Sequence, residues 1–212
     1  YLHATESNKN TFITGVATDS HRLSSSSISV QNLKNFSSII IPRKTVFQLC
    51  SLITEIDDKL FIQTTVNKIK FSLGKINLIS KVIDGKFPDY QKVVPKDNSK
   101  TLTVSSSDFI NSVERVTSVS LDRKEGVKLE LSQDKLKLSV NSTNSGDGNE
   151  EISAKYNGDN FTIGFNSKYL IDIATEIEDK NLTFNLKDSN SPVLVIDNSD
   201  KNSFYVIMPM KI

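Results

Sequence analysis

The sequence predicts an α+β fold, and three observations lead to that class. Short runs of alternating apolar and polar residues dominate the chain, as in half-buried antiparallel strands. Three other stretches carry apolar residues at helical spacing. The hexapeptide at residues 54–59 recurs in similar form at residues 175–180, which indicates one supersecondary unit present twice. We therefore expect mostly sheet with a few amphipathic helices.

Strands are expected where the alternation is clearest. Seven runs show this period of two: residues 59–65, 67–73, 75–82, 127–131, 135–140, 161–165 and 192–196. Residues 204–208 are expected to finish the last sheet, whereas Pro209 has no N–H to donate and does not suit a central strand. Residues 209–212 should therefore lie on an edge or in a groove.

Three helices are expected, each beginning at a residue that suits a helix start. Pro42 can begin the first, Ser106 or Ser107 can cap the second, and Asn166 can cap the third. Their apolar faces would carry, in chain order, Val46, Leu49, Cys50, Ile53 and Ile56, then Phe109, Val113 and Val116, then Tyr169, Leu170, Ile173 and Ile177. On this pattern Cys50 is interpreted as a core residue.

The repeat divides the chain into two domains. Its offset of 121 residues also pairs Leu49 with Leu170, and it exceeds the period of a solenoid. The polar connector at residues 95–100 marks the boundary, so we expect domains of residues 1–97 and 98–212. Residues 24–27 are expected to form a loop or solvated edge, and residues 142–149 a hairpin loop.

Composition excludes several classes of protein. Of the 212 residues, 37% are hydrophobic and 24% are charged, which is ordinary globular usage. The single cysteine excludes an internal disulfide framework and fits a reducing cytosol. We find no signal peptide and no apolar run near the roughly 18 residues of a membrane helix, so we expect a cytoplasmic protein. The chain starts at Tyr1 without an initiator methionine, so we expect the true N-terminus to be missing.

Charge is divided unequally between the two halves. Residues 1–97 hold thirteen Lys and Arg against eight Asp and Glu, a net of +5, whereas residues 98–212 hold thirteen against seventeen, a net of −4. A protein that grips nucleic acid by charge is normally clearly basic. The overall charge of +1 therefore predicts that any DNA contact is weak or local.

Residues 17–23 bring Asp19, Ser20 and His21 together in sequence, but their adjacency argues against a catalytic triad. Consecutive residues of an extended chain point to alternate sides, and no Gly-x-Ser-x-Gly turn presents a nucleophile. The alternative is a polar turn. His3 lacks metal-ligand spacing, and the glycines form no phosphate loop. We therefore expect no catalytic residue, no metal site and no cofactor.

Two further motifs have open interpretations. Arg43 and Lys44 lie at a predicted helix start, where cations oppose the helix dipole, so they serve either a phosphate contact or simply a solvated surface. Residues 85–90 place Phe87 and Tyr90 around Pro88, which commonly only pins a loop onto a core.

Together, residues 17–23, 41–44, 83–90 and 205–210 resemble the bacterial replicative sliding clamp, the β subunit of DNA polymerase III. The resemblance covers essentially the whole chain and begins inside the middle one of three similar domains. It implies a partial middle domain at residues 1–97 and a C-terminal domain at residues 98–212. It also implies a homodimer ring around duplex DNA, with antiparallel sheets outside and amphipathic helices facing the DNA channel. A ring is retained topologically, so modest charge suffices and no base readout is needed.

The resemblance also implies which residues meet partners. Polymerase, clamp loader and repair proteins would dock short linear motifs in a pocket lined by Leu2, Thr18, Ser20, His21, Arg22, Leu23, Pro88, Val93, Asn166, Tyr169, Pro192, Val206, Ile207, Met208, Pro209, Met210, Lys211 and Ile212. A groove of Leu, Val, Pro and flexible Met suits such promiscuous recognition. The implied DNA contacts are Lys44, Arg43, Lys92 and Tyr1, and the implied dimer interface includes Ser118, Val119, Glu150 and Glu151.

The chain departs from the family pattern at three pocket positions. Ser20 replaces a usual glycine, and Lys211 and Ile212 replace a usual arginine and leucine. Our functional hypothesis is a non-enzymatic sliding clamp that acts as a processivity factor. The alternatives are a generic β-rich interaction domain with an apolar C-terminal docking strand, and a hydrolase using Ser20 and His21, which the triad geometry disfavours.

Overall fold

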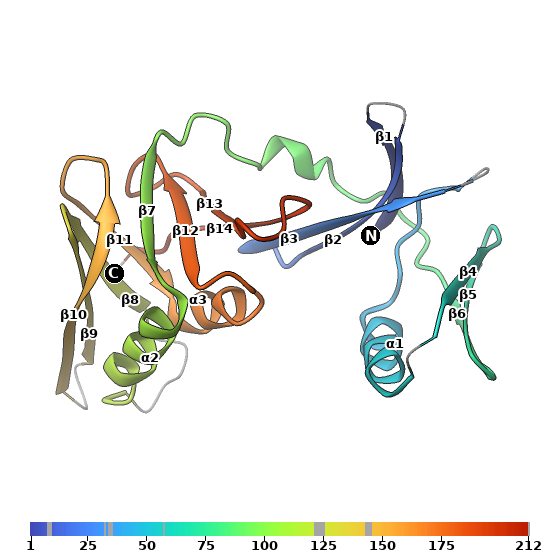
Figure 1. Cartoon of the computed structure of the whole chain (residues 1–212), viewed down its shortest axis with the longest axis horizontal. Coiled ribbons are helices and arrows are strands. Elements are labelled where there is room, and N and C mark those ends of the chain that lie inside the picture. The colour runs from blue at the N-terminus through green and yellow to red at the C-terminus, as the bar shows by residue number, and fades with distance from the viewer. Residues whose placement is uncertain are drawn as a thin grey trace. The chain divides into compact units, whose positions relative to one another are not determined.

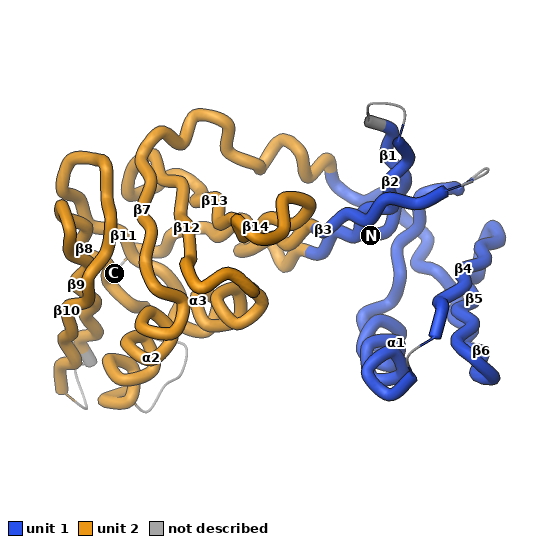
Figure 2. Tube along the Cα trace, viewed as in Figure 1, with its two compact units in different colours: residues 1–17, 26–88 blue, residues 18–25, 89–212 orange. Residues whose placement is uncertain are grey.

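The computed structural model describes residues 1–7, 10–31, 33, 36–56, 58–120, 126–142 and 146–211. These residues form two compact units, which Figure 2 shows in different colours. Unit 1 contains residues 1–17 and 26–88, and unit 2 contains residues 18–25 and 89–212. Both units combine antiparallel strands with helix, which confirms the predicted α+β class.

Unit 1 contains two groups of antiparallel strands (Figure 1). In the first group, β1 (Leu2–Ser7) pairs with β2 (Asn10–Thr18), and β3 (Arg22–Val30) follows β2 in the sheet. The second group is a meander of β4 (Leu60–Thr64), β5 (Lys68–Leu73) and β6 (Ile76–Lys81). The tip of the β2–β3 hairpin, residues 18–25, belongs to unit 2.

The helix of unit 1, α1 (Arg43–Glu55), begins directly after Pro42, as the sequence predicts. Its burial is smaller than its periodicity predicts, because only Thr45 is buried along its length. Leu49 packs against a small core of Ile39, Ile69 and Phe71. Cys50 is exposed, so its interpretation as a core residue is wrong. It lies about 100° around the helix from Leu49, off the face that meets the core.

Unit 2 contains a sheet whose neighbouring strands are all antiparallel. In sheet order its strands are β14 (Ser203–Ile207), β13 (Val193–Ile196), β12 (Asn181–Leu186), β7 (Lys100–Ser105), β10 (Gly146–Tyr156), β9 (Lys135–Ser142), β8 (Gly126–Ser132) and β11 (Phe161–Asn166). Strand β11 stands last in this order. A 3-10 helix, Tyr90–Lys92, precedes β7.

Two helices of unit 2 pack against this sheet and against each other (Figure 1). Helix α2 (Ser106–Thr117) contacts β7, β8, β9 and β10, and α3 (Ser167–Ala174) contacts β11. Phe109 of α2 is fully buried, and its ring lies 5.4 Å from that of Phe184. Burial of one such side chain stabilises the fold by about 1.5–3 kcal/mol.

The helix caps of unit 2 agree only partly with the prediction. Asn166 caps α3, since its side chain accepts a hydrogen bond from the Tyr169 N–H at 3.3 Å. The cap of α2 is Ser105, whose hydroxyl accepts from the Asp108 N–H at 3.3 Å, so the choice of Ser106 or Ser107 is wrong by one or two residues.

Each of the seven predicted strands is confirmed within two residues at either end, and the predicted final strand corresponds to β14. Residues 24–27 lie in β3 and not in a loop, and of the two expectations only the solvated one fits in part, since Ser24 and Ser26 are exposed. Ser25 is buried, and the hydroxyls of Ser27 and Thr14 form a hydrogen bond of 2.9 Å. The predicted hairpin loop at 142–149 is too long, since β9 and β10 pair from Ser142 and Gly146 onward.

Some predictions lie outside the described residues. They concern residues 143–145 of the hairpin, Asp57 of the repeated hexapeptide and Ile212 of the pocket. The boundary between residues 97 and 98 falls between the 3-10 helix and β7 and stays a prediction.

Candidate functional site

The tip of the β2–β3 hairpin is a hydrogen-bonded turn within unit 2. The Asp19 carboxylate accepts hydrogen bonds from the backbone N–H groups of His21 (3.1 Å) and Arg22 (3.0 Å). The Thr18 hydroxyl donates to the Arg22 carbonyl at 2.8 Å. Ser20 adopts a φ of 74°, a left-handed conformation that costs about 1–2 kcal/mol for a residue other than glycine. The polar-turn interpretation is confirmed.

Arg22 connects this turn to helix α3. Its Nη1 donates to Asp172 Oδ2 at 2.6 Å, and its Nε donates to Asp19 Oδ2 at 3.1 Å. The guanidinium also lies over the Tyr169 ring, 4.3 Å from the centroid. The His21 ring stacks on Tyr169 with 6.3 Å between centroids. These contacts fix a polar and aromatic cluster, which we call the Arg22 cluster and define as Asp19, His21, Arg22, Tyr169 and Asp172.

The electrostatics of the Arg22 cluster favour the charged forms of Asp19, Arg22 and Asp172. Burial opposes the charge on Asp172, but hydrogen bonds from Arg22 and Lys168 outweigh it and lower the pKa of the carboxyl. Burial likewise opposes the charge on Asp19, whose pKa is nevertheless lowered by bonds from the turn and from Arg22. The pKa of Arg22 is raised by both carboxylates against the opposing effect of burial. All three groups are therefore ionised at neutral pH.

The C-terminal segment, residues 206–211, reaches the same region. The Met208 N–H donates to the His21 carbonyl at 2.8 Å, and the Met210 N–H donates to the Gly164 carbonyl of β11 at 2.8 Å. Val206 and Ile207 are buried as the end of β14, while Met208 and Met210 are both 39% exposed. The segment thus closes the sheet with its first half and presents two thioether side chains at the surface, next to β11.

The structure brings together part of the predicted partner pocket. Within unit 2, Thr18, His21, Arg22 and Tyr169 meet directly, with Met208 bonded to His21 and Asn166 capping α3. Leu23 is buried, whereas Val93 is 48% exposed and Pro192 precedes β13. Leu2 and Pro88 belong to unit 1, where Leu2 bridges to Ile39. The membership of all these residues in one partner pocket stays a prediction.

Asp172 and the structural role of Asp19 are not apparent from the sequence alone. Asp172 lies 150 residues after Arg22, so no local pattern joins them. A signal existed within α3, because Asp172 stands four residues after Lys168 and binds it at 3.0 Å. The bonds of Asp19 to Arg22 and to the turn give it a structural role and separate it from any triad with Ser20 and His21.

The predicted DNA contacts lie in separate environments. Arg43 and Lys44 are exposed in the first turn of α1, which has no acidic residue, and Arg43 lies over the Phe47 ring at 5.1 Å. Tyr1 stacks on Phe87 with 4.5 Å between centroids, which agrees with the interpretation of residues 85–90 as a pinned loop. Lys92 is paired with Asp89 at 3.4 Å in unit 2.

The predicted dimer residues gather where α2 ends beside β10. The Glu150 carboxylate accepts from Arg115, with Nε to Oε2 at 2.9 Å, and Glu151 pairs with Lys135 at 2.7 Å. Ser118 caps α2 and Val119 packs against the core of unit 2. Gly148 of β10 is obligatory here, because a Cβ atom would lie 2.4 Å from the Val116 carbonyl oxygen.

Metal clusters and membrane helices are both missing from the described residues. Within them, no group of three or more His, Cys, Asp or Glu side chains could hold a metal ion. No helix in the described part of the chain is long and apolar enough to cross a membrane.

Comparison with known proteins shows which protein family the chain matches. Residues 91–211 match the family model for the C-terminal domain of the DNA polymerase III beta subunit, and residues 3–89 match the model for its central domain. The chain is 35% identical to the beta sliding clamp of Caulobacter vibrioides strain NA1000, over 100% of this chain and 57% of the relative. It is 32% identical to that of Escherichia coli K12, over 93% of this chain and 54% of the relative.

Solved structures give the same result. The sliding clamp of Bartonella birtlesii bound to griselimycin has a TM-score of 0.95 at 38% identity, covering 100% of this chain and 57% of that one. A Caulobacter crescentus sliding clamp has a TM-score of 0.94 at 35% identity, with the same coverage. The chain thus spans a little over half the length of these relatives. Because the match to the C-terminal domain alone covers more than half of its residues, the chain belongs to the DNA polymerase III beta subunit family.

Proposed function

We propose that this chain is the C-terminal part of a sliding clamp, a processivity factor that encircles duplex DNA and tethers the replicative polymerase. Residues 1–97 would be part of the middle domain and residues 98–212 the C-terminal domain. The full-length protein would be a homodimer ring acting in the cytoplasm on chromosomal DNA. Its contribution is mechanical, so we propose no catalytic residue and no cofactor. Family membership makes the alternative of a generic β-rich interaction domain the weaker hypothesis.

One observation carries the partner-binding part of the proposal. Three segments distant in sequence, the hairpin tip at 18–25, helix α3 and residues 206–211, meet within unit 2. They hold an arginine, a histidine and a tyrosine in fixed positions, and the backbone of Met208, one of two methionines that are 39% exposed, bonds to the histidine. Flexible thioethers adapt to varied apolar side chains, while a few fixed polar groups orient a peptide. This combination suits short linear motifs of polymerase, clamp loader and repair proteins.

The DNA-facing part of the proposal rests on α1. Arg43 and Lys44 stand in its first turn, where cations are unfavourable to the helix dipole, and no acidic residue of that turn offsets them. An electrostatic contact with phosphate would compensate for this cost. Such contacts carry no sequence information, which suits a protein that slides. The dimer role of Ser118, Val119, Glu150 and Glu151 is part of the same proposal.

Peptide titration tests the pocket. The full-length protein would be titrated against a fluorescent peptide from the polymerase's clamp-binding tail, with Tyr169→Ala and Met208→Ala as test variants. Each should weaken binding at least tenfold, whereas Val66→Ala, at a fully exposed site in unit 1, should leave it unchanged. Undiminished binding by both test variants would remove the pocket assignment.

A topological assay tests the ring. After loading, the full-length protein should stay on nicked circular DNA and leave once the circle is linearised. Equal loss from circular and linear DNA would contradict encirclement. Arg43→Gln together with Lys44→Gln should shorten the residence time at low salt, because phosphate contacts are salt-dependent.

A further inference from the structure

The first half of the chain concentrates its positive charge in one sheet. The net charge of +5 on residues 1–97 comes entirely from residues 59–81, which contain five Lys and no Arg, Asp or Glu. The rest of residues 1–97 holds eight cations and eight anions. Strands β5 and β6 carry three of the five lysines, namely Lys68, Lys70 and Lys81. The DNA contacts proposed above include none of them.

The three lysines lie on the face of the sheet that is turned away from helix α1. The other face packs on the helix (Figure 1), since the hydroxyls of Ser80 in β6 and Thr45 in α1 form a hydrogen bond of 2.7 Å. Ile69 of β5 is buried in the small core that α1 also contacts. Side chains alternate between the two faces along a strand. The sequence neighbours of Ser80 and Ile69 therefore point away from α1, and these are Lys68, Lys70, Ile79 and Lys81.

The lysines meet at one end of that face and have no acidic partner. The register places Lys68 directly opposite Lys81, so their Cβ atoms are about 5 Å apart, and Lys70 lies about 7 Å along β5 from Lys68. None of the three forms an ion pair with a residue that the structure describes. The Asp58 carboxylate lies beside Gly74, in the turn at the other end of β5. Like charges directly opposite each other destabilise a sheet, so this arrangement favours binding of an anion.

Two large apolar side chains are exposed on the same face. Phe61 of β4 is 63% exposed and Ile79 of β6 is 61% exposed. Ile79 lies opposite Lys70 in the register, and Phe61 lies opposite Ser72, two residues along β5 from Lys70. Covering these side chains would remove apolar surface from water and add to the attraction of the lysines. We call this surface the lysine face and define it as Phe61, Lys68, Lys70, Ile79 and Lys81.

The composition of the lysine face favours a polypeptide over a nucleic acid. Proteins that hold single strands combine cations with aromatic side chains on which successive bases stack, whereas Phe61 is the one aromatic residue of this face. Strands β4, β5 and β6 also contain no Arg, the residue best suited to phosphate. A polypeptide can place carboxylates beside apolar side chains, so that both the lysines and Ile79 meet a complementary group.

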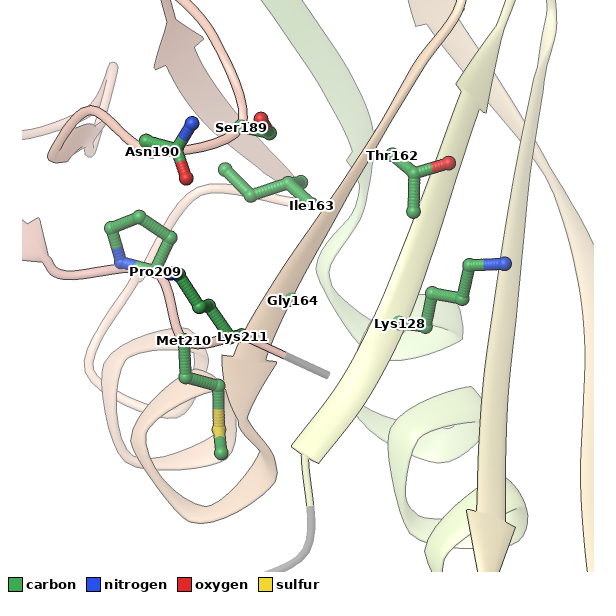
Figure 3. A pocket seen from close by; sticks show the side chains of 9 residues that line it. All are labelled: Lys128, Thr162, Ile163, Gly164, Ser189, Asn190, Pro209, Met210 and Lys211. Atoms are coloured by element: carbon green, nitrogen blue, oxygen red, sulfur yellow. The ribbon is translucent and has the colours of Figure 1, made fainter.

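We propose that the lysine face docks an acidic segment of a partner protein. Carboxylates of the segment would meet the three lysines, and an adjacent apolar side chain would cover Phe61 or Ile79. This inference goes beyond the proposed function and concerns unit 1 alone. The cavity of about 480 Å³ beside residues 209–211 is a different feature, because β8, β11 and the turn between β12 and β13 form it within unit 2 (Figure 3).

Paired peptides test the lysine face on the full-length protein, with the partner pocket filled by unlabelled polymerase-tail peptide. One fluorescent peptide carries a run of Glu beside a Phe and an Ile, and the other has Gln in place of each Glu. The Glu peptide should bind about tenfold tighter at about 50 mM salt, as expected for three exposed ion pairs together. The difference should fall below about twofold at about 500 mM salt. Equal binding of the two peptides at low salt would overturn the proposal.

Two variants of equal charge show where the Glu peptide binds. The test variant combines three substitutions on the lysine face: Lys68→Gln, Lys70→Gln and Lys81→Gln. The control removes the same charge at three exposed sites of unit 2: Lys155→Gln, Lys187→Gln and Lys201→Gln. The test variant should lose the preference for the Glu peptide, whereas the control should keep it within about twofold. An equal loss in both variants would show attraction by net charge alone and would overturn the proposal.

Lysine acetylation separates a polypeptide from a nucleic acid as the occupant. The Glu peptide should slow acetylation of Lys68, Lys70 and Lys81 in the full-length protein, as read by mass spectrometry. A single-stranded oligonucleotide of the same charge should not. Protection by the oligonucleotide and not by the peptide would overturn the proposal and identify a nucleic-acid surface. Neither result bears on the partner pocket or the ring.

Discussion

Replacing Asp172 with asparagine tests whether the Arg22 cluster organises the partner pocket. The change keeps the size of the side chain and one acceptor oxygen but removes the charge that meets Arg22 Nη1 at 2.6 Å. Arg22 would keep Asp19 as its only carboxylate partner among the described residues, at 3.1 Å. We expect the guanidinium to lose its fixed position over Tyr169, and His21 to lose part of its support.

The expected loss of stability in Asp172→Asn follows from how exposed the Arg22 and Asp172 side chains are. The Arg22 and Asp172 side chains are 28% and 35% exposed, so solvent screens the pair in part. Fully exposed pairs contribute about 0.2–1 kcal/mol, and breaking a buried pair costs about 3–5 kcal/mol. Asp172→Asn should therefore lower the free energy of unfolding by about 1 kcal/mol. Loss of the fixed Arg22–Tyr169 contact adds a similar amount to the cost of peptide binding, which weakens affinity about three- to tenfold.

A double-mutant cycle measures this coupling. Arg22→Met, Asp172→Asn and the double variant would be compared by thermal unfolding and by titration with the polymerase-tail peptide. The coupling energy in unfolding should be about 0.5–1 kcal/mol, since the residues are in contact and Asp172→Asn as a whole costs about 1 kcal/mol. Lys168→Gln is the matched control, because Lys168 binds the same carboxylate at 3.0 Å but is 59% exposed. It should change stability by less than about 0.5 kcal/mol.

Two results would refute this role of Asp172. A coupling energy near zero would show that the 2.6 Å contact does not stabilise the fold in solution. Peptide affinity within twofold of the unmodified protein, together with a measurable loss of stability, would show that the cluster supports the fold and not the pocket. Either result would remove Asp172 as a positioning residue.

Ser20→Gly should raise the free energy of unfolding by about 0.5–1 kcal/mol in a denaturant titration, because φ at this residue is 74°. Asp134→Gly should have the same effect, because φ at Asp134 is 61°. A loss of stability in both variants would contradict the strain at these residues. Gly148→Ala should lower the melting temperature by several degrees, since its Cβ would lie 2.4 Å from the Val116 carbonyl, whereas Gly15→Ala, with no atom within 4 Å of its Cβ, is the steric control. The pKa values of Asp19 and Asp172 are lower in the folded protein than in the unfolded chain. Their contribution to the stability of the fold is therefore complete above the unfolded pKa near 3.9, and it is lost as pH falls through the folded values. Urea unfolding from pH 7 to pH 2.5 should show a smaller loss of stability in Asp172→Asn than in the unmodified protein.

The candidate site was predictable to the extent that its residues lie in local motifs. The turn at Asp19 to Arg22 and the cap at Asn166 follow from side chains that bond to backbone within three residues. The partnership of Arg22 with Asp172 joins residues 150 apart and depends on how α3 meets the hairpin tip. The cavity beside residues 209–211 has the same origin, because its lining residues come from four separate elements. Local sequence patterns do not show that such side chains meet, because only the fold brings them together.

Helices α1 and α3 show what an apolar period does and does not encode. Both carry the repeated pattern, with Leu49 matching Leu170 at the offset of 121 residues. In unit 2, α3 contacts α2 and β11, and it buries Leu170, Ile173 and Ala174. In unit 1, α1 is the one helix among the described residues, and it leaves Phe47 61% exposed. The period specifies which face of a helix is apolar, whereas burial depends on the elements that cover that face. Cys50 is misassigned because it lies about 100° around the helix from Leu49, off the covered face, although the helix itself is predicted correctly.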